Sequence, residues 1–339
     1  MIYNDAEFFN ADRVIEKDGI PGVVLNRYSG KAVDGLDTGE DRRGAVTQAY
    51  GNEIEIRFVA EKDCVDIHLG AYDKDGYVSI SNGDYHNSVA YLPQDRITRI
   101  RLERHPRLRL LGDVGPERFS REVWRITYLK RFTPVFAGID GMGGSVRPPA
   151  PDEIPSKTML AYGSSITFGA GTGPMSVLTH MQILAQKLGI QVMNKSMPGS
   201  CFCEFSLGDF LSGIPADYYF YELGGNMRLR YSPGVFAKRA EHLVSKTRER
   251  NPASPIILLT VYPLLKSIPD EDHEKASAVI VKYDETLYRL AKKYGNIHMV
   301  DSADILNDPR MLSFDGLHPS GYGNIEMAAN LYEKLKNII

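Results

Sequence analysis

Residues 158–171, TMLAYGSSITFGAG, place two adjacent serines directly after a short apolar run. Such a run followed by glycine and serine is typical of a buried strand that ends in a loop. Beyond it, short apolar runs alternate with segments of helical period. The predicted strands are 158–162, 191–194, 217–223, 255–261 and 297–300, and the predicted helices are 175–188, 233–250, 274–294 and 320–338. This alternation predicts a parallel sheet covered by helices on both faces, with Ser164 and Ser165 at its carboxyl edge, where ligands bind.

The residues before this segment follow a different period. Between about residues 45 and 130, apolar and polar residues alternate strictly, and Asp-Gly, Asn-Gly and Gly-Asp pairs separate the runs. The alternating apolar positions include Ile54, Ile56, Phe58, Val65, Ile67, Leu69, Val78, Ile80, Ile100, Leu102, Trp124, Ile126 and Tyr128. Short alternating strands with tight turns predict an antiparallel β-sandwich.

A stretch rich in Gly and Pro, residues 138–155, separates the two patterns. Glycine and proline supply turns and extended chain but do not sustain regular ladders, so this stretch is predicted to join two domains. We predict a β-sandwich over residues 1–140, a linker over 141–155 and an α/β domain over 156–339.

The composition excludes several classes of protein. The chain has 339 residues, of which 43% are apolar, and this amount of apolar side chain argues against a largely disordered chain. The net charge of −3 argues against a nucleic-acid partner, because affinity for the phosphate backbone needs clustered Lys and Arg. The one basic run, residues 96–109, alternates with apolar residues, which favours solvated strand faces over a nucleic-acid patch.

The sequence shows neither a signal peptide nor a membrane-spanning segment. The first residues, MIYNDAEFFNADRV, lack the basic start and apolar core of a signal peptide, and no apolar stretch is long enough to span a membrane. These features predict a cytoplasmic protein with no membrane partner. The three cysteines, Cys64, Cys201 and Cys203, suggest no disulfide framework, and we expect buried free thiols.

The sequence also predicts neither a metal nor a cofactor. Four histidines lie in or beside the predicted elements without companion ligands at a metal-binding spacing: His180, His242, His273 and His298. Neither the G-x-G-x-x-G motif nor the P-loop is present, and the G-x-S-x-G elbow of α/β-hydrolases is also missing.

A second chemical segment, residues 315–321 (DGLHPSG), comes directly before the last predicted helix. A serine hydroxyl becomes a good nucleophile when an imidazole takes its proton, and the imidazole needs a carboxylate to fix its tautomer. Asp315 and His318, three residues apart, can supply both groups. The alternative is structural: a serine after a strand often caps a helix, Asp315 can cap a turn, and His318 can pack near the helix with Ser320 as its N-cap.

Together these segments resemble the four blocks of the GDSL, or SGNH, hydrolase superfamily. The first block aligns with Gly163-Ser164-Ser165-Ile166-Thr167, the glycine of the second with Gly199, the third with Gly224-Gly225-Asn226 and the fourth with Asp315 and His318. The resemblance covers about residues 155–339. It implies an α/β fold with a flavodoxin-like parallel sheet flanked by helices. The predicted sandwich before it is similar to the jelly-roll of two-domain members, some of which act on acetylated carbohydrate.

The resemblance implies a role for each block. Ser165 would be the nucleophile, His318 the base and Asp315 the group that orients it. The oxyanion hole would consist of the backbone N–H groups of Ser165 and Gly199 and the side-chain amide of Asn226. A plain turn at Gly199 and a capping role for Asn226 are the alternatives.

The sequence departs from the superfamily pattern at two positions. Ser164 stands where the name-giving aspartate usually lies, and Met227 stands where the third block often ends in aspartate. Neither change removes a proton-transfer or oxyanion group, so the departures concern the support of the loop and the subfamily.

The function implied by the resemblance is a serine esterase. Such an enzyme would cleave a short-chain acyl ester, in particular acetyl, on a small molecule or an oligosaccharide, through an acyl-enzyme intermediate. Two alternatives stay open: an acyltransferase with the same Ser-His-Asp site, and a carbohydrate-binding protein whose hydrolase domain is inactive. The sequence leaves the oligomeric state open, a homo-oligomer included.

Overall fold

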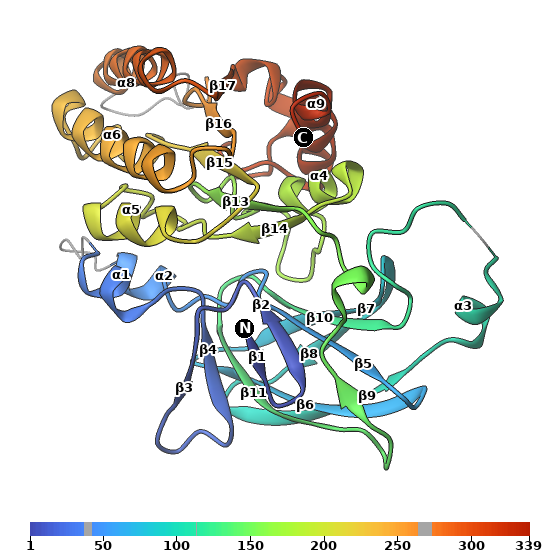
Figure 1. Cartoon of the computed structure of the whole chain (residues 1–339). Helices are drawn as coiled ribbons and strands as arrows, with labels where there is room; N and C mark the ends of the chain where they lie inside the picture. The colour runs from blue at the N-terminus through green and yellow to red at the C-terminus, as the bar shows by residue number, and fades with distance from the viewer. Residues whose placement is uncertain (37–42, 113, 264–272) are drawn as a thin grey trace. The chain divides into compact units, whose positions relative to one another are not determined.

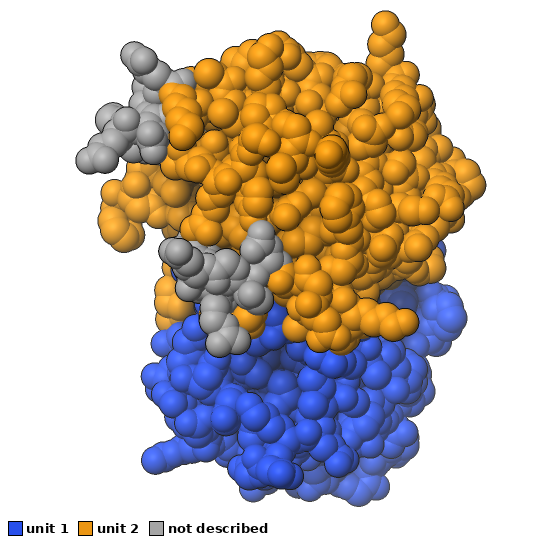
Figure 2. Space-filling model, turned by 90° about the vertical axis from the view of Figure 1, so that its left-hand side faces the viewer, with its two compact units in different colours: residues 1–28, 48–156 blue, residues 29–47, 157–339 orange. Residues whose placement is uncertain are grey.

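The computed structural model describes residues 1–36, 43–112, 114–263 and 273–339, and their strands form three sheets. The contacts within the chain divide it into two units (Figure 2). Unit 1 comprises residues 1–28 and 48–156, and unit 2 comprises residues 29–47 and 157–339.

These units differ from the predicted boundaries at two places. Residues 29–47, expected in the sandwich, belong to unit 2, because they form α1 (Gly30–Asp34) and α2 (Arg43–Thr47) and α1 packs along helix α5 (Phe205–Ser212). The predicted linker belongs to unit 1, because β12 (Val146–Arg147) pairs with β5 (Glu55–Ala60).

Unit 1 is a sandwich of two antiparallel sheets, as predicted. The first sheet has the order β1 (Ile2–Tyr3), β2 (Ala6–Phe9), β5, β10 (Val123–Leu129), β7 (Gly76–Asn82) and β8 (Tyr85–Leu92), with β12 beside β5. The second sheet has the order β3 (Arg13–Glu16), β4 (Val23–Asn26), β11 (Thr133–Asp140), β6 (Cys64–Tyr72) and β9 (Arg96–Glu103).

The predicted alternation places the core of unit 1 between these sheets. Ile56 and Trp124 of the first sheet and Ile67 and Leu69 of the second are fully buried in one hydrophobic cluster. Their polar neighbours along each strand point to the opposite face, as the two-residue period of a strand requires. Truncation of a buried aromatic side chain such as that of Trp124 typically costs about 3–5 kcal/mol of stability.

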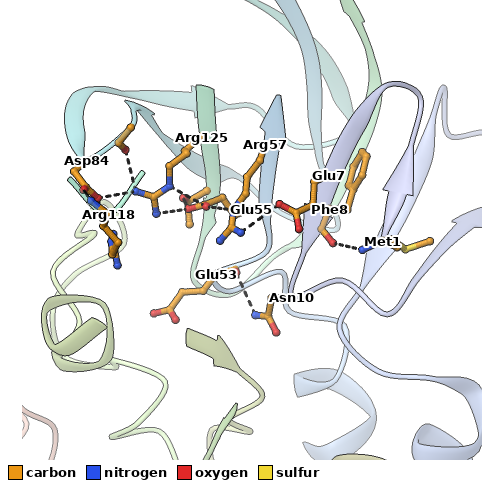
Figure 3. Close-up of polar contacts among 12 residues, drawn as sticks. Met1, Glu7, Phe8, Asn10, Glu53, Glu55, Arg57, Asp84, Arg118 and Arg125 are labelled. Carbon is orange, nitrogen blue, oxygen red and sulfur yellow. Dashed lines mark hydrogen bonds and ion pairs between the residues drawn. The ribbon is translucent and has the colours of Figure 1, made fainter. Parts of the chain in front are cut away.

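The outer face of the first sheet carries a network of charged side chains (Figure 3). Glu55 on β5 accepts hydrogen bonds from Arg125 at 2.8 and 2.9 Å and from Arg57 at 2.5 Å. Arg57 also reaches Glu7 at 3.3 Å. The guanidinium carbon of Arg57 lies 3.9 Å from the centre of the Phe9 ring, and that of Arg125 lies 3.9 Å from the centre of the Phe119 ring. Aromatic rings of unit 1 therefore cover both cations.

The basic run at residues 96–109 follows the prediction only in part. Arg96–Glu103 forms strand β9, but Pro106–Leu110 forms a short helix, α3. The helix begins here because Pro106 fits its first position and the His105 ring accepts a hydrogen bond from the Arg107 N–H at 3.1 Å.

Unit 2 is built on a five-stranded parallel sheet with the order β14, β13, β15, β16, β17. The strands are β13 (Thr158–Tyr162), β14 (Gln191–Asn194), β15 (Tyr218–Glu222), β16 (Ile256–Leu259) and β17 (Ile297–Val300). In chain order this is 2-1-3-4-5, the flavodoxin-like arrangement, so the predicted fold is confirmed. The order reverses between β13 and β15, and ligands bind at this switch point in such sheets.

Helices cover both faces of this sheet (Figure 1). Helices α4 (His180–Leu188) and α9 (Gly321–Leu335) pack together on one face, and α5, α6 (Pro233–Arg250) and α8 (His273–Tyr294) form a row on the other. The helix predicted at 175–188 begins only at His180, because Thr179 caps it. Short 3₁₀ turns lie at Pro151–Glu153, Ser302–Asp304 and Pro309–Met311. Within the described ranges, no helix has both the length and the apolar character that crossing a membrane requires.

Candidate active site

Ser165 lies in the loop that follows β13, at the carboxyl edge of the parallel sheet. The loop is a series of tight turns, in which the Ala170 N–H donates to the Ser165 carbonyl at 2.9 Å and the Phe168 N–H donates to the Ser164 carbonyl at 3.1 Å. Ser164 is buried, whereas Ser165 is partly exposed. Of the two adjacent serines, Ser165 is therefore the one that a ligand can reach.

The structure places His318 and Asp315, the residues of the fourth block, next to the Ser165 hydroxyl. The Oγ atom of Ser165 lies 2.8 Å from Nε2 of His318, and Nδ1 of the same ring lies 2.7 Å from Oδ2 of Asp315. An ionised carboxylate only accepts hydrogen bonds, so Nδ1 donates to Asp315 and Nε2 is left to accept from the Ser165 hydroxyl. An arrangement of this kind can move a proton from the hydroxyl to the ring.

Asp315 is held as a carboxylate. Partial burial raises its pKa, but hydrogen bonds from the His318 ring and backbone N–H, from the Leu317 N–H and from the Ser313 hydroxyl outweigh this effect. The resulting pKa of Asp315 lies well below its ordinary value, so the group stays ionised throughout the neutral range.

The loop that carries Asp315 and His318 also has the turn and the helix cap that were the structural alternative. Asp315 Oδ1 accepts hydrogen bonds from the Leu317 and His318 N–H groups, each at 2.9 Å, which closes a turn. Ser320 caps helix α9 by accepting from the Gly323 N–H at 3.1 Å. The turn and the cap lie on either side of the His318 ring that contacts Ser165, so the structural roles and the catalytic role are compatible.

The second block lies next to the nucleophile loop. The Met197 N–H donates to the Gly163 carbonyl at 2.9 Å, which joins the segment after β14 to the segment after β13. Gly199 has a φ of +72°, a left-handed conformation that glycine adopts without strain. The backbone N–H groups of Ser165 and Gly199 donate no hydrogen bond to any residue that the structure describes.

The third block follows β15. Asn226 accepts a hydrogen bond from the Cys201 N–H through its Oδ1 atom, at 3.1 Å. This contact orients the amide, because it leaves Nδ2 as the atom available to donate. Among the described residues, no acceptor lies within hydrogen-bond distance of Nδ2. The Nδ2 group of Asn226, which is partly exposed, is therefore available to donate to a ligand.

Two supporting residues, Thr47 and Glu222, lie outside the sequence motifs. Thr47, in the segment 29–47, lies 2.6 Å from the hydroxyl of Ser200, next to Gly199, and both side chains are buried. Glu222 and Thr167 hold the nucleophile loop from within unit 2. Each contact joins residues far apart in the sequence, so no local pattern predicts it.

The remaining candidate ligands do not assemble a metal site. Among the described residues, no group of three or more His, Cys, Asp and Glu could hold a metal ion. His180 is buried beside Asn324, and His242 lies 2.9 Å from Asp209, while the His273 side chain falls outside the described residues. Cys201 and Cys203 are buried free thiols, as expected, and Cys64 is half-buried.

Residues 156–336, more than half of the chain, match the GDSL-like lipase/acylhydrolase family. The chain belongs to this family. A search of curated proteins finds no match. Membership of this family agrees with the predicted superfamily and indicates that this GDSL-like protein is an ester hydrolase.

Solved structures share the fold along the whole chain. The salicylyl-acyltransferase SsfX3 from a tetracycline biosynthetic pathway has a TM-score of 0.75 and 14% identity, with 98% of this chain and 96% of that chain covered. The acetyl xylan esterase Est2A from Butyrivibrio proteoclasticus has a TM-score of 0.62, 13% identity, and coverage of 100% and 96%. A family two carbohydrate esterase from Cellvibrio japonicus has a TM-score of 0.60, 13% identity, and coverage of 99% and 96%. At these identities, the likeness establishes the fold alone.

Proposed function

We propose that this GDSL-like protein is a serine esterase in which Ser165 is the nucleophile, His318 the base and Asp315 the group that orients the base. The observation that carries the proposal is the pair of contacts on the His318 ring, 2.8 Å to the Ser165 hydroxyl and 2.7 Å to the Asp315 carboxylate. The position of the three groups at the switch point of a parallel sheet supports it further.

In the first half of the reaction, Ser165 Oγ attacks the ester carbonyl while His318 Nε2 takes its proton. The resulting imidazolium donates through Nδ1 to Asp315, which stabilises the cation without taking the proton itself. His318 then gives its proton to the departing alcohol, and the acyl group stays on Ser165. Because the pKa of Asp315 is well below its ordinary value, this carboxylate stays ionised and keeps orienting the ring as the pH falls from neutral.

The negative oxygen of the tetrahedral intermediate needs donors that are aimed before the reaction starts. The proposed donors are the Ser165 and Gly199 N–H groups and Nδ2 of Asn226. Their lack of other acceptors among the described residues supports this assignment. A water molecule then attacks the acyl-enzyme while His318 takes its proton, and His318 returns this proton to Ser165 Oγ as the bond to the acyl group breaks and the acid is released.

The proposed substrate is a small-molecule or oligosaccharide ester with a short acyl group, in particular an acetyl ester of a carbohydrate. Support comes from the fold shared with an acetyl xylan esterase and a family two carbohydrate esterase. This part of the proposal is an analogy between folds.

Turnover of p-nitrophenyl acetate and of acetylated oligosaccharides tests the proposal. We expect Ser165→Ala to lower kcat by at least roughly 10³-fold and to abolish labelling by a fluorophosphonate, because the acyl-enzyme can no longer form. Ser164→Ala is the matched control, and it should still be labelled. If the wild-type protein binds oligosaccharides but neither turns over any ester nor reacts with the probe, the carbohydrate-binding alternative is correct.

The same site can also transfer its acyl group to an alcohol. The fold shared with a salicylyl-acyltransferase, with the TM-score of 0.75, favours this second function. Product analysis with and without an acceptor alcohol separates the two functions. An acyltransferase gives the new ester in preference to the free acid, whereas an esterase gives the free acid under both conditions.

A further inference from the structure

Glu222 is a buried acid directly behind the nucleophile loop. It is the last residue of β15 and is only 2% exposed. Its Oε2 atom accepts a hydrogen bond from the Ser164 N–H at 2.7 Å and another from the Thr167 hydroxyl at 3.0 Å. These two donors flank Ser165 on both sides, so the carboxyl group holds the turn that presents the nucleophile.

The backbone of the nucleophile loop packs tightly against this carboxyl group. A Cβ atom at Gly163 would lie 2.7 Å from Glu222 Oε2 and 2.5 Å from Thr167 Oγ1. Atoms cannot approach this closely, so glycine is required at position 163. A side chain at position 163 would therefore displace the Glu222 carboxyl group and the Thr167 hydroxyl from the turn.

The backbone of the same residue also contacts residues 199–201 directly, and through them residues 224–226. The Glu222 carbonyl accepts a hydrogen bond from the Cys201 thiol at 3.6 Å, and the Cys201 N–H in turn orients the amide of Asn226. Residues 163–167, 199–201 and 224–226 are thus linked through one position on β15.

Stability alone does not account for a carboxyl group at this place. In the described part of the chain Glu222 forms no ion pair, and its hydrogen bonds come from neutral donors. Burial raises its pKa, and the hydrogen bonds from Ser164 and Thr167 offset that effect only in part. Burying an acid without a cation opposes folding, so a gain elsewhere is needed to explain it.

We propose that Glu222 is a positioning residue, whose side chain fixes the turn around Ser165 in the orientation that His318 needs. The inference rests on the proposed function. It also explains the departure at position 164, because an aspartate there would place a second carboxylate beside Glu222. Ser164 supplies its N–H to the acid instead, and its hydroxyl accepts from the Ile166 N–H at 3.2 Å.

Steady-state kinetics with p-nitrophenyl acetate and the rate of fluorophosphonate labelling test this role. We expect Glu222→Ala to lower kcat by roughly 10- to 100-fold with little change in KM, because a small displacement of the nucleophile affects the reaction more than binding. Glu222→Gln should restore most of the activity, since its amide oxygen still accepts both hydrogen bonds. Thr167→Val, which removes one donor, should lower kcat by a smaller factor.

Tyr221→Phe is the matched control. Tyr221 precedes Glu222 on the same strand, is fully buried, and loses only its 2.8 Å hydrogen bond to Thr247 on substitution. Its kcat should equal that of the wild type. An equal loss of kcat in Tyr221→Phe and Glu222→Ala would overturn the proposal, because it would reflect general destabilisation.

The other outcomes are also decisive. If Glu222→Ala does not fold, Thr167→Val and Glu222→Gln carry the test, and an unchanged kcat in Thr167→Val overturns the positioning role. A wild-type protein without turnover or labelling overturns the proposed function itself. An active wild type with an equally active, folded Glu222→Ala overturns this inference alone.

Discussion

Unit 1 and unit 2 each bury a glutamate at the end of an inner strand, and the two are held in opposite ways. Burial raises the pKa of Glu55 in unit 1, but Arg125 and Arg57 outweigh this effect and hold it well below its ordinary value. Burial also raises the pKa of Glu222 in unit 2, and only neutral donors oppose it, so its pKa stays above the ordinary value. Glu55 is part of a network of ion pairs, whereas Glu222 accepts hydrogen bonds from neutral donors only, as far as the described residues show.

This contrast indicates that Glu55 serves stability and Glu222 serves the geometry of the site. In unit 1 the carboxylate of Glu55 pairs with both Arg57 and Arg125 beside aromatic rings, so it stabilises two buried cations at once. In unit 2 the acid contacts the backbone of a loop that carries a candidate nucleophile. We expect unit 1 substitutions to change stability and unit 2 loop substitutions to change activity.

The largest effect should come from removing the charge of Glu55. Glu55→Gln removes the buried carboxylate that Arg57 and Arg125 share, and removing one member of a buried ion pair typically costs about 3–5 kcal/mol. Trp124 is the one tryptophan of the chain and lies in the core of unit 1, so its fluorescence during urea unfolding measures this loss.

Two variants serve as references for this measurement. Glu61→Gln removes an exposed carboxylate from the same unit and should leave the midpoint of urea unfolding unchanged. Glu222→Gln removes a carboxyl group that no cation compensates in the described part of the chain, and the unfolding free energy of unit 2, followed by far-UV circular dichroism, should stay unchanged or rise. A Glu55→Gln midpoint equal to that of Glu61→Gln would contradict the proposed contrast between the two acids.

The next largest effect is a loss of kcat on substitution of Asn226, which lies in a unit 2 loop. Removal of one preorganised oxyanion donor typically lowers kcat by roughly 10²–10³-fold, or about 3–4 kcal/mol. We expect Asn226→Ala to show this loss in kinetics with p-nitrophenyl acetate and a nearly unchanged unfolding midpoint. Asn330→Ala, which removes a hydrogen bond to the Ile305 carbonyl elsewhere in unit 2, is the control and should retain full kcat. Loss of stability without loss of kcat in Asn226→Ala would favour the capping role for this residue.

Elements with a long, regular period could be predicted from the sequence. Helix α6 spans the predicted residues 233–250, and each strand of the parallel sheet lies within two residues of its predicted bounds. The segment 29–47 could not be assigned to unit 2, because its short helices carry no periodic signal and its position depends on packing against α5. Helix α5 itself, with eight residues, is too short to show its period clearly.

The same distinction holds in the site. Ser165, Asp315 and His318 could be named in advance because their spacing follows known motifs. Glu222 could not, because it ends an apolar strand, YYFYE, and its partners lie 55 and 58 residues away. A buried acid of this kind becomes visible only when folding brings the nucleophile loop onto the neighbouring strand.

The smallest predicted effect is a difference in the pH dependence of stability. The pKa of Glu55 is lowered on folding, so its contribution is present above its unfolded value of 4.5 and is lost as the pH falls below it. The pKa of Glu222 is raised, so the folded state binds its proton more tightly, and stability falls as the pH rises from 4.5 through the folded value. Tryptophan fluorescence follows unit 1, and far-UV circular dichroism at 222 nm follows mainly unit 2, which holds the longer helices. We expect Glu55→Gln to remove the rising component from the first signal and Glu222→Gln to remove the falling component from the second. The same sign of change in both variants would mean that the two acids are held alike, and the comparison would fail.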